Sequence, residues 1–233
     1  MRPALVAVSH GTASSDGQVA VAELVGAVRR RLVDVDVLDA FVDVQEPALA
    51  SVLEGSPGPS VVIPLLLTPG FHVRVDVARA IATRQATAAP VLGPDAAITA
   101  ILLDRLDAVG LRDDDAVVLG VAGSSDVRAR HSTDRAATRL AMALGREVRV
   151  GHLGGIGRPI GSVAAEAAAA GRRVVAATYL LAPGHFTDLM NRCGADAVTR
   201  PVLGGGSPDD RLVQLVVDRY SEAAAKWQLR RAS

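Results

Sequence analysis

The strongest constraint on the fold is an internal repeat, because the two halves of the chain share four anchors in the same order. Glycine and proline are common in turns, so one such match could arise by chance, but four in order could not. The spacing is 112 positions for the first two anchors and then 114 and 111: Gly11 with Gly123, Pro47 with Pro159, Leu67–Gly70 with Leu181–Gly184, and the identical Pro90–Gly93 and Pro201–Gly204. The sequence therefore predicts a tandem duplication.

Short apolar, β-branched runs alternate with amphipathic stretches of helical length in both halves. This alternation predicts parallel sheets covered by helices on both faces. The first expected strand ends at 6–8, and the others are 35–42, 60–67, 90–92, 116–121, 147–153 and 173–181. The expected helices are 16–32, 47–53, 74–87, 95–109, 125–144, 159–170 and 209–226. We expect an α/β protein of two tandem, flavodoxin-like, three-layer domains, residues 1–110 and 116–227, joined by the acidic segment 110–115.

Composition narrows the range of partners. The 25 basic and 25 acidic side chains balance, which argues against a general nucleic-acid binder. Cys193 is the single cysteine, so neither an intrachain disulfide nor a cysteine-based metal site can form. The N-terminal apolar run is too short for a secretory signal, and no run approaches the length of a membrane helix. We expect a cytoplasmic protein without nucleic-acid or membrane partners, as a monomer or homodimer.

Titratable side chains follow three predicted strands of the first half. His10, Glu46 and His72 come after the first, second and third strand, where ligands bind in open parallel sheets. The fold would bring the histidines to one rim, with Glu46 between them. Imidazole can bind a divalent transition metal or accept a proton near neutral pH, and a carboxylate can assist either role. A single histidine in such a loop is more often a surface residue, and two at adjacent strand ends favour a site.

The second half lacks this set. In the sequence alignment His10 corresponds to Ala122, Glu46 to Arg158 and His72 to Phe186, although His185 lies one position earlier. This pattern predicts one metal-handling site in the first half and a degenerate second domain.

Three segments carry a family resemblance: Ser9–Thr12, Asp43–Leu49 and Pro64–Asp76. Together they resemble the sirohydrochlorin chelatases, the ATP-independent class II enzymes, in their long two-domain form. The resemblance implies a lyase-type chelatase that inserts iron(II) or cobalt(II), and in some members nickel(II), into sirohydrochlorin for siroheme or cobalamin-type tetrapyrrole synthesis. It implies that the two histidines matching His10 and His72 hold the metal.

The resemblance and the chemistry together define the expected site. We expect His10, His72 and Glu46 to be catalytic, with His10 and His72 binding the metal and accepting pyrrole protons. We expect no tightly bound cofactor, since Fe²⁺, or else Co²⁺, is a substrate alongside the tetrapyrrole. Glycines, hydroxyls and an arginine are expected to contact the tetrapyrrole: Ser9, Gly11, Thr12, Gly70, Phe71, Arg74, Ser124 and Ser125.

Three other functions stay open from the residues. A nucleotide-binding oxidoreductase is suggested by Gly154–Gly161, although its glycine spacing departs from the dinucleotide fingerprint and no acidic residue follows about 20 positions on. A histidine phosphatase would carry arginine where Ser9 stands. A protein that carries the metal or tetrapyrrole without catalysis would need the same ligands as an enzyme.

Overall fold

In the computed structural model of the chain, residues 2–204 and 206–232 are described, and the side chains of residues 71–74 and 230–232 lie outside that description. The chain divides into two compact units. Unit 1 combines Met1–Leu92 with Ser207–Ser233, and unit 2 is the continuous segment Gly93–Gly206. Among the described residues, no helix is both long enough and apolar enough to cross a membrane.

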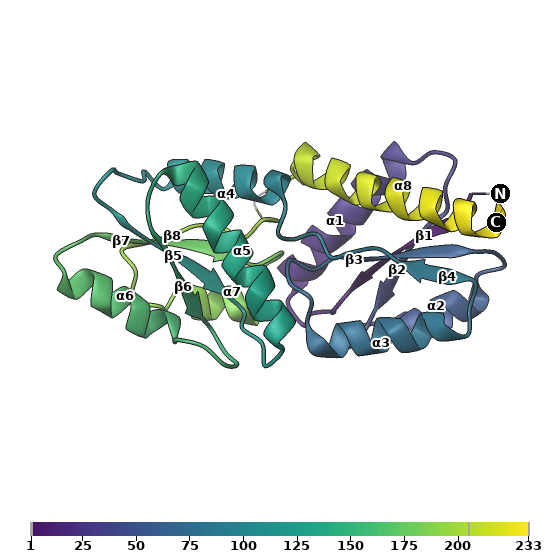
Figure 1. Cartoon of the computed structure of the whole chain (residues 1–233), viewed down its shortest axis with the longest axis horizontal. Coiled ribbons are helices and arrows are strands. Elements are labelled where there is room, and N and C mark those ends of the chain that lie inside the picture. The colour runs from purple at the N-terminus through teal and green to yellow at the C-terminus, as the bar shows by residue number, and fades with distance from the viewer. Residues whose placement is uncertain (1, 205, 233) are drawn as a thin grey trace. The chain divides into compact units, whose positions relative to one another are not determined.

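Unit 1 is built on a parallel sheet with strand order β2-β1-β3-β4 (Figure 1). Its strands are β1 (Ala4–Ser9), β2 (Val37–Phe41), β3 (Ser60–Pro64) and β4 (Ala86–Ala88). Leu5 lies opposite both Val37 and Val61, so β1 is a central strand. Every residue of β3 is buried, as its nearly unbroken apolar sequence predicts for a strand covered on both faces.

Four helices cover this sheet, and they are arranged in two layers (Figure 1). The helices are α1 (Ser15–Arg31), α2 (Leu49–Gly55), α3 (Phe71–Ala82) and α8 (Asp210–Ala232). Leu49 and Leu53 of α2 and Val77 of α3 pack in one core with Val6 and Val62 of the sheet. The helices α1 and α8 lie together on the opposite face.

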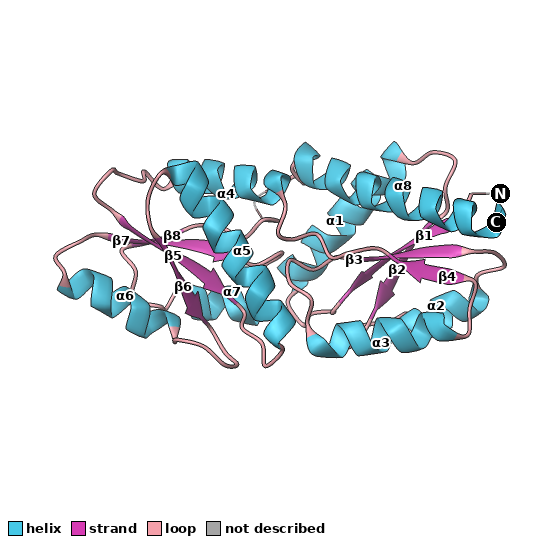
Figure 2. Cartoon of the chain, viewed as in Figure 1, coloured by secondary structure: helices cyan, strands magenta, loops and turns pink. Residues whose placement is uncertain are grey.

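Unit 2 repeats the same topology, with strand order β6-β5-β7-β8 (Figure 2). Its strands are β5 (Ala116–Val121), β6 (Val148–His152), β7 (Val174–Tyr179) and β8 (Ala197–Val198). Its helices are α4 (Ala96–Ala108), α5 (Val127–Leu144), α6 (Ile160–Ala169) and α7 (His185–Met190). The expected α/β fold with two parallel sheets is therefore confirmed.

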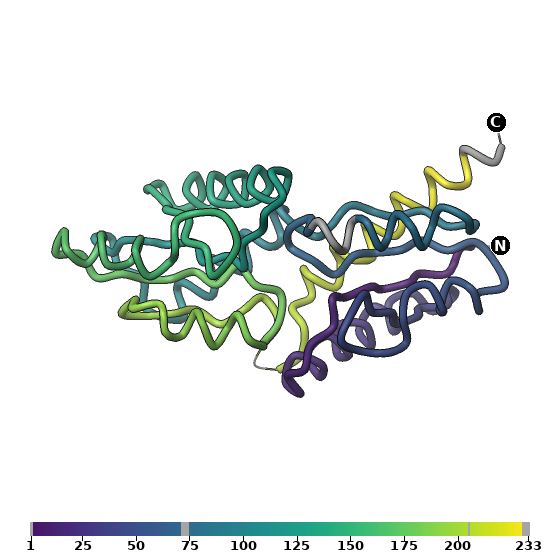
Figure 3. Tube along the Cα trace, turned by 90° about the horizontal axis from the view of Figure 1, so that it is seen from below, coloured from purple at the N-terminus to yellow at the C-terminus, as the bar shows by residue number. Residues whose placement is uncertain are grey.

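The units differ from the expected boundaries of 1–110 and 116–227. The last helix of each half of the repeat, α4 or α8, belongs to the unit formed by the other half, an arrangement called the helix exchange below. Helix α4 packs on α5 and β7, whereas α8 packs on α1, β3 and β4. Figure 3 shows α8, in yellow, beside the early segments of unit 1. The Tyr220 hydroxyl of α8 donates to the Pro3 carbonyl at 2.7 Å, and Arg31 of α1 pairs with Asp210 at 2.9 Å.

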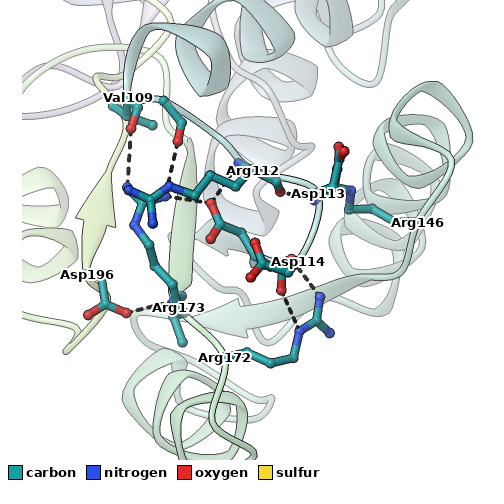
Figure 4. A network of polar contacts seen from close by, with 11 residues as sticks. Val109, Arg112, Asp113, Asp114, Arg146, Arg172, Arg173 and Asp196 are labelled. Carbon is teal, nitrogen blue, oxygen red and sulfur yellow. Dashed lines mark hydrogen bonds and ion pairs between the residues drawn. The ribbon is translucent and has the colours of Figure 1, made fainter.

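A polar network fastens the segment between α4 and β5 to the amino edge of the unit 2 sheet (Figure 4). Asp115 is 0% exposed, and its Oδ2 accepts from the Arg173 guanidinium and from the Arg112 backbone N–H. Arg173 also donates to the carbonyls of Val109 and Gly110. A buried carboxylate needs such partners, so the sequence's acidic linker is an integral part of unit 2.

Two predicted elements were wrong in position. The strand expected at 90–92 is β4 at Ala86–Ala88, and the preceding helix ends at Ala82 instead of 87. The β3 ladder runs from the Ser60 N–H, bonded to the Gln85 carbonyl, to the Ala89 N–H, bonded to Val62. Pro90 has no N–H with which to extend it. No element was predicted at α7 and β8, the counterparts of α3 and β4 in unit 2.

Candidate active site at the carboxyl edge of unit 1

The loop after β1 is fixed by backbone contacts to the loop after β2. The Val42 N–H donates to the Ser9 carbonyl, and the Asp43 N–H donates to the His10 carbonyl, both at 3.0 Å. These bonds continue the β1–β2 ladder beyond the strand ends. His10 therefore has a defined backbone position, while its side chain is exposed at the edge of the sheet.

Gly11 allows this close approach. Its φ is +90°, and a Cβ built there would lie 2.0 Å from the Asp43 carbonyl oxygen. Only glycine fits a left-handed position with a backbone oxygen so near. The glycine of Ser9–His10–Gly11 is thus required by the protein's own loops.

Side chains complete the junction between these two loops. Gln45 Oε1 accepts from the Thr12 N–H at 2.9 Å, and Thr12 Oγ1 accepts from the Ser14 N–H at 3.1 Å. Ser14 then caps α1 by accepting from Gly17 N–H. Gln45 was not singled out from the sequence, because an amide at this position has no distinctive pattern. Its role becomes visible only when the two loops are placed side by side.

Glu46 forms a hydrogen bond at the start of α2, in addition to its expected catalytic role. Its Oε2 accepts from the Ala48 N–H at 2.7 Å, at the first turn of α2, where a carboxylate satisfies a free backbone donor. Its side chain is otherwise exposed. One carboxylate oxygen is thus committed to the α2 terminus.

The loop after β3 carries the second histidine. The backbone of residues 71 and 72 begins α3, with Gly70 as its N-terminal cap residue. The side chains of Phe71, His72 and Arg74 lie outside the described residues. At Gly70 φ is −64° and an added Cβ would meet nothing within 4 Å, so the fold does not require glycine there.

The order of these loops along the sheet edge differs from the expected one. Since β1 lies between β2 and β3, His10 occupies the middle, with the Glu46 loop on one side and the His72 loop on the other. The expectation that Glu46 lies between the histidines was wrong, because the chain order of the strands is not their spatial order. Among the described side chains, no three His, Cys, Asp or Glu residues form a metal-binding cluster.

Two cavities flank the edge of unit 1. One of about 370 Å³ lies between α1 and β2 and reaches Ser9, Gln45 and Glu46. The other, of about 420 Å³, is almost wholly apolar and lies between α3 and the 88–91 segment, reaching Pro69 and Gly70. The proposed site is therefore bordered by concave surface on both sides.

The corresponding edge of unit 2 has a different chemistry. The β1–β3 register in unit 1 matches the β5–β7 register in unit 2, and Gly70 and Gly184 are the N-cap residues of the helices that follow β3 and β7. Ala122 therefore lies at the position of His10 and Phe186 at that of His72, as expected. His185 is exposed and stacks obliquely on Phe186, with ring centroids 5.6 Å apart. Ser124 Oγ accepts from the Asp126 N–H, and Ser125 is exposed.

The counterpart of Glu46 needs a correction. Phe41 bridges Ala48 in unit 1 and His152 bridges Pro159 in unit 2, so this segment repeats at 111 positions. Glu46 therefore corresponds to Gly157 and not to Arg158. The Pro47 and Arg158 carbonyls accept from the Phe41 and His152 N–H groups, so the anchor that paired Pro47 with Pro159 was wrong by one position. A Cβ at Gly157 would lie 2.3 Å from the His152 ring, which excludes a carboxylate there. Burial is the main cause that lowers the pKa of His152. Asp134 raises this pKa and Arg130 lowers it, both by less.

The glycine-rich segment 154–157 is explained by the same contacts. A Cβ at Gly155 would meet the Ser124 backbone nitrogen at 2.8 Å, and one at Gly123 would lie 1.8 Å from the Gly154 oxygen. These glycines let two loops of unit 2 touch each other. They give no support to a dinucleotide site, in which glycines leave room for a pyrophosphate.

Comparisons with known proteins show a similar family model and similar folds. Residues 4–109 match the CbiX family model. SirB from Bacillus subtilis with Fe³⁺ has a TM-score of 0.80 at 20% identity, covering 98% of both chains. Sirohydrochlorin chelatase SirB from B. subtilis subspecies spizizenii with cobalt has a TM-score of 0.75 at 17% identity, covering 97% of this chain and 96% of that one.

A third structure is CbiX, described as the terminal enzyme for biosynthesis of siroheme in denitrifying bacteria. Its TM-score is 0.67 at 16% identity, and the match covers 94% of this chain and 99% of that one. No curated protein matches the sequence. Residues 4–109 are therefore similar to the CbiX family, and the chain as a whole has the fold of the solved SirB and CbiX structures.

Proposed function

We propose that the protein inserts a divalent metal, Fe²⁺ or else Co²⁺, into sirohydrochlorin. The observation that carries the proposal is the placement of His10 and the His72 loop at the ends of adjacent strands β1 and β3, in the half that matches the CbiX family. Unit 2 has Ala122, Gly157 and Phe186 at the equivalent positions. One site per chain, in unit 1, is the arrangement that this asymmetry supports.

The reaction replaces two pyrrole N–H protons by one M²⁺ ion. His10 and His72, when neutral, hold the incoming ion as it loses water, and they accept the released protons. A protonated imidazole cannot bind metal, so the ion binds to the deprotonated histidines. Glu46, with one oxygen fixed at α2, can orient an imidazole or take a proton through the other.

The tetrapyrrole carries many carboxylates. Backbone N–H groups at the start of the helices of unit 1 and the hydroxyls of Ser9 and Thr12 can receive them, together with Arg74. The proposal places the protein in the cytoplasm, as expected for an enzyme of tetrapyrrole synthesis.

Metallation of sirohydrochlorin, followed by absorbance with Fe²⁺, Co²⁺ and Ni²⁺, tests the proposal. Wild type at substoichiometric concentration should give multiple turnovers, whereas a carrier would stop at one equivalent. His10→Ala and His72→Ala should each remove the acceleration and leave the circular dichroism spectrum unchanged. His131→Ala is the matched control, since His131 is exposed on α5 of unit 2. Full turnover in both site variants would refute the assignment.

A further inference from the structure

One residue at the edge of unit 1 has a strained backbone. Val44 has φ +65° and is the one non-glycine residue in the left-handed region within the described part of the chain. A β-branched residue in this conformation is a genuine outlier, since its Cβ crowds the following carbonyl. Such strain persists where the surroundings impose it, and it concentrates at functional sites.

The second unit makes the same turn without strain. Asp43 and Gly154 are equivalent, because their carbonyl oxygens face the Cβ positions of Gly11 and Gly123. The next residues are Val44 at φ +65° and Gly155 at φ +66°. The repeat therefore contains glycine at the position where unit 1 keeps a valine.

The fold of unit 1 gives no reason for this valine. Its side chain is 58% exposed, so it adds little to the core. Its N–H donates to Asp43 Oδ1 at 2.8 Å, a bond that glycine would make equally well. Neither packing nor hydrogen bonding explains the isopropyl group.

The position of Val44 is close to the proposed site. It lies between Asp43, whose N–H binds the His10 carbonyl, and Gln45, whose amide binds the Thr12 N–H. The turn that holds Val44 is thus bonded on both sides to the loop that carries His10. The exposed part of this apolar side chain is available to a bound molecule.

We propose that Val44 is a substrate-contacting residue whose isopropyl group packs against the apolar face of the tetrapyrrole macrocycle. The inference rests on the proposed function, which supplies a ligand with a flat apolar centre and a charged periphery. Burying an isopropyl group against such a face removes apolar surface from water and strengthens binding. The backbone strain is kept because glycine would remove this contact.

Three variants test the proposal: Val44→Gly, Val44→Thr and Val33→Gly. Val44→Gly removes strain and side chain together, and Val44→Thr keeps the β-branched shape but introduces a hydroxyl. Val33→Gly is the matched control, because Val33 is an 88% exposed valine of unit 1 after α1, at the other edge of the sheet, with an ordinary backbone. Each variant is measured for melting temperature, for affinity to metal-free sirohydrochlorin by fluorescence, and for KM values of tetrapyrrole and Co²⁺.

Val44→Gly should raise the melting temperature by roughly 2–4 °C. It should weaken tetrapyrrole affinity about five- to tenfold and leave KM for Co²⁺ unchanged. Val44→Thr should melt like wild type and lose affinity, and Val33→Gly should not change affinity.

Wild-type affinity in both Val44 variants, or a loss only in Val44→Gly, would overturn the contact role, as would a lower melting temperature of Val44→Gly. A wild-type protein that neither binds nor metallates sirohydrochlorin would instead refute the proposed function.

Discussion

The junction between the loops after β1 and β2 can be broken by a single methyl group in Gly11→Ala. The new Cβ would lie 2.0 Å from the Asp43 oxygen and 3.1 Å from the Asp43 carbon. No side-chain rotation relieves a contact between backbone atoms. The two loops must separate by about 1 Å to reach ordinary contact distance.

The cost of this change can be worked from the contacts. A Cβ at φ +90° adds about 1–2 kcal/mol of strain. Separation of the loops weakens the bonds from Val42 to Ser9 and from Asp43 to His10, at about 1 kcal/mol each. We expect a loss of roughly 3 kcal/mol in the free energy of unfolding. A shift of about 1 Å at His10 should lower the metallation rate roughly 100-fold.

Gly123→Ala is the matched control, because its Cβ would lie 1.8 Å from the Gly154 oxygen in the equivalent junction of unit 2. It should cost as much stability and leave kcat for metallation near wild type, with any loss confined to KM for the tetrapyrrole. Urea denaturation followed by circular dichroism measures both variants. Fluorescence of Trp227, the chain's one tryptophan, reports on α8 of unit 1. Equal loss of kcat in the two variants, or wild-type stability of Gly11→Ala, would refute the reasoning.

Three further changes have definite expected outcomes. Asp115→Ala should lower the free energy of unfolding by about 3–5 kcal/mol in urea denaturation, because Arg173 loses its carboxylate partner, and a loss under about 1 kcal/mol would contradict this. His152→Phe should flatten the decline of stability from pH 7.5 to 5.5. Burial holds the pKa of His152 below that of the unfolded chain despite Asp134, so the unfolded state takes the proton first as pH falls below about 6.5; an unchanged slope would exclude this cause. His185→Ala should change the metallation rate less than about twofold, and a larger loss would show that unit 2 takes part in catalysis.

Strands buried on both faces could be predicted from the sequence, and β5 at Ala116–Val121 matches its prediction in both bounds. A continuous apolar run must be covered on two sides, whatever its neighbours are. The helix exchange could not be predicted, since an apolar stripe on α4 or α8 does not say which sheet it will cover. The apolar pattern of a helix predicts that one of its faces is buried, but it does not predict which sheet covers that face.

The candidate site could likewise be predicted only in part. The candidate residues of unit 1 could be placed at the strand ends, because the loops at that edge directly follow the predicted strands along the chain. Their expected spatial order along the edge was wrong, because in this sheet β1 lies between β2 and β3. The strained turn at Val44 and the bridging amide of Gln45 were missed, because backbone angles and contacts between loops have no sequence pattern of their own.

The helix exchange also sets the order in which the chain can fold during synthesis. Unit 2 is one continuous segment, so all its contacts can form once Gly206 has left the ribosome. Unit 1 lacks the cover of α8 on β3 and β4 until Ser207–Ser233 emerge. The unit with the proposed site therefore completes its core last, around an already folded insertion. A nascent chain stopped before α8 would expose apolar sheet surface, which a chaperone can recognise.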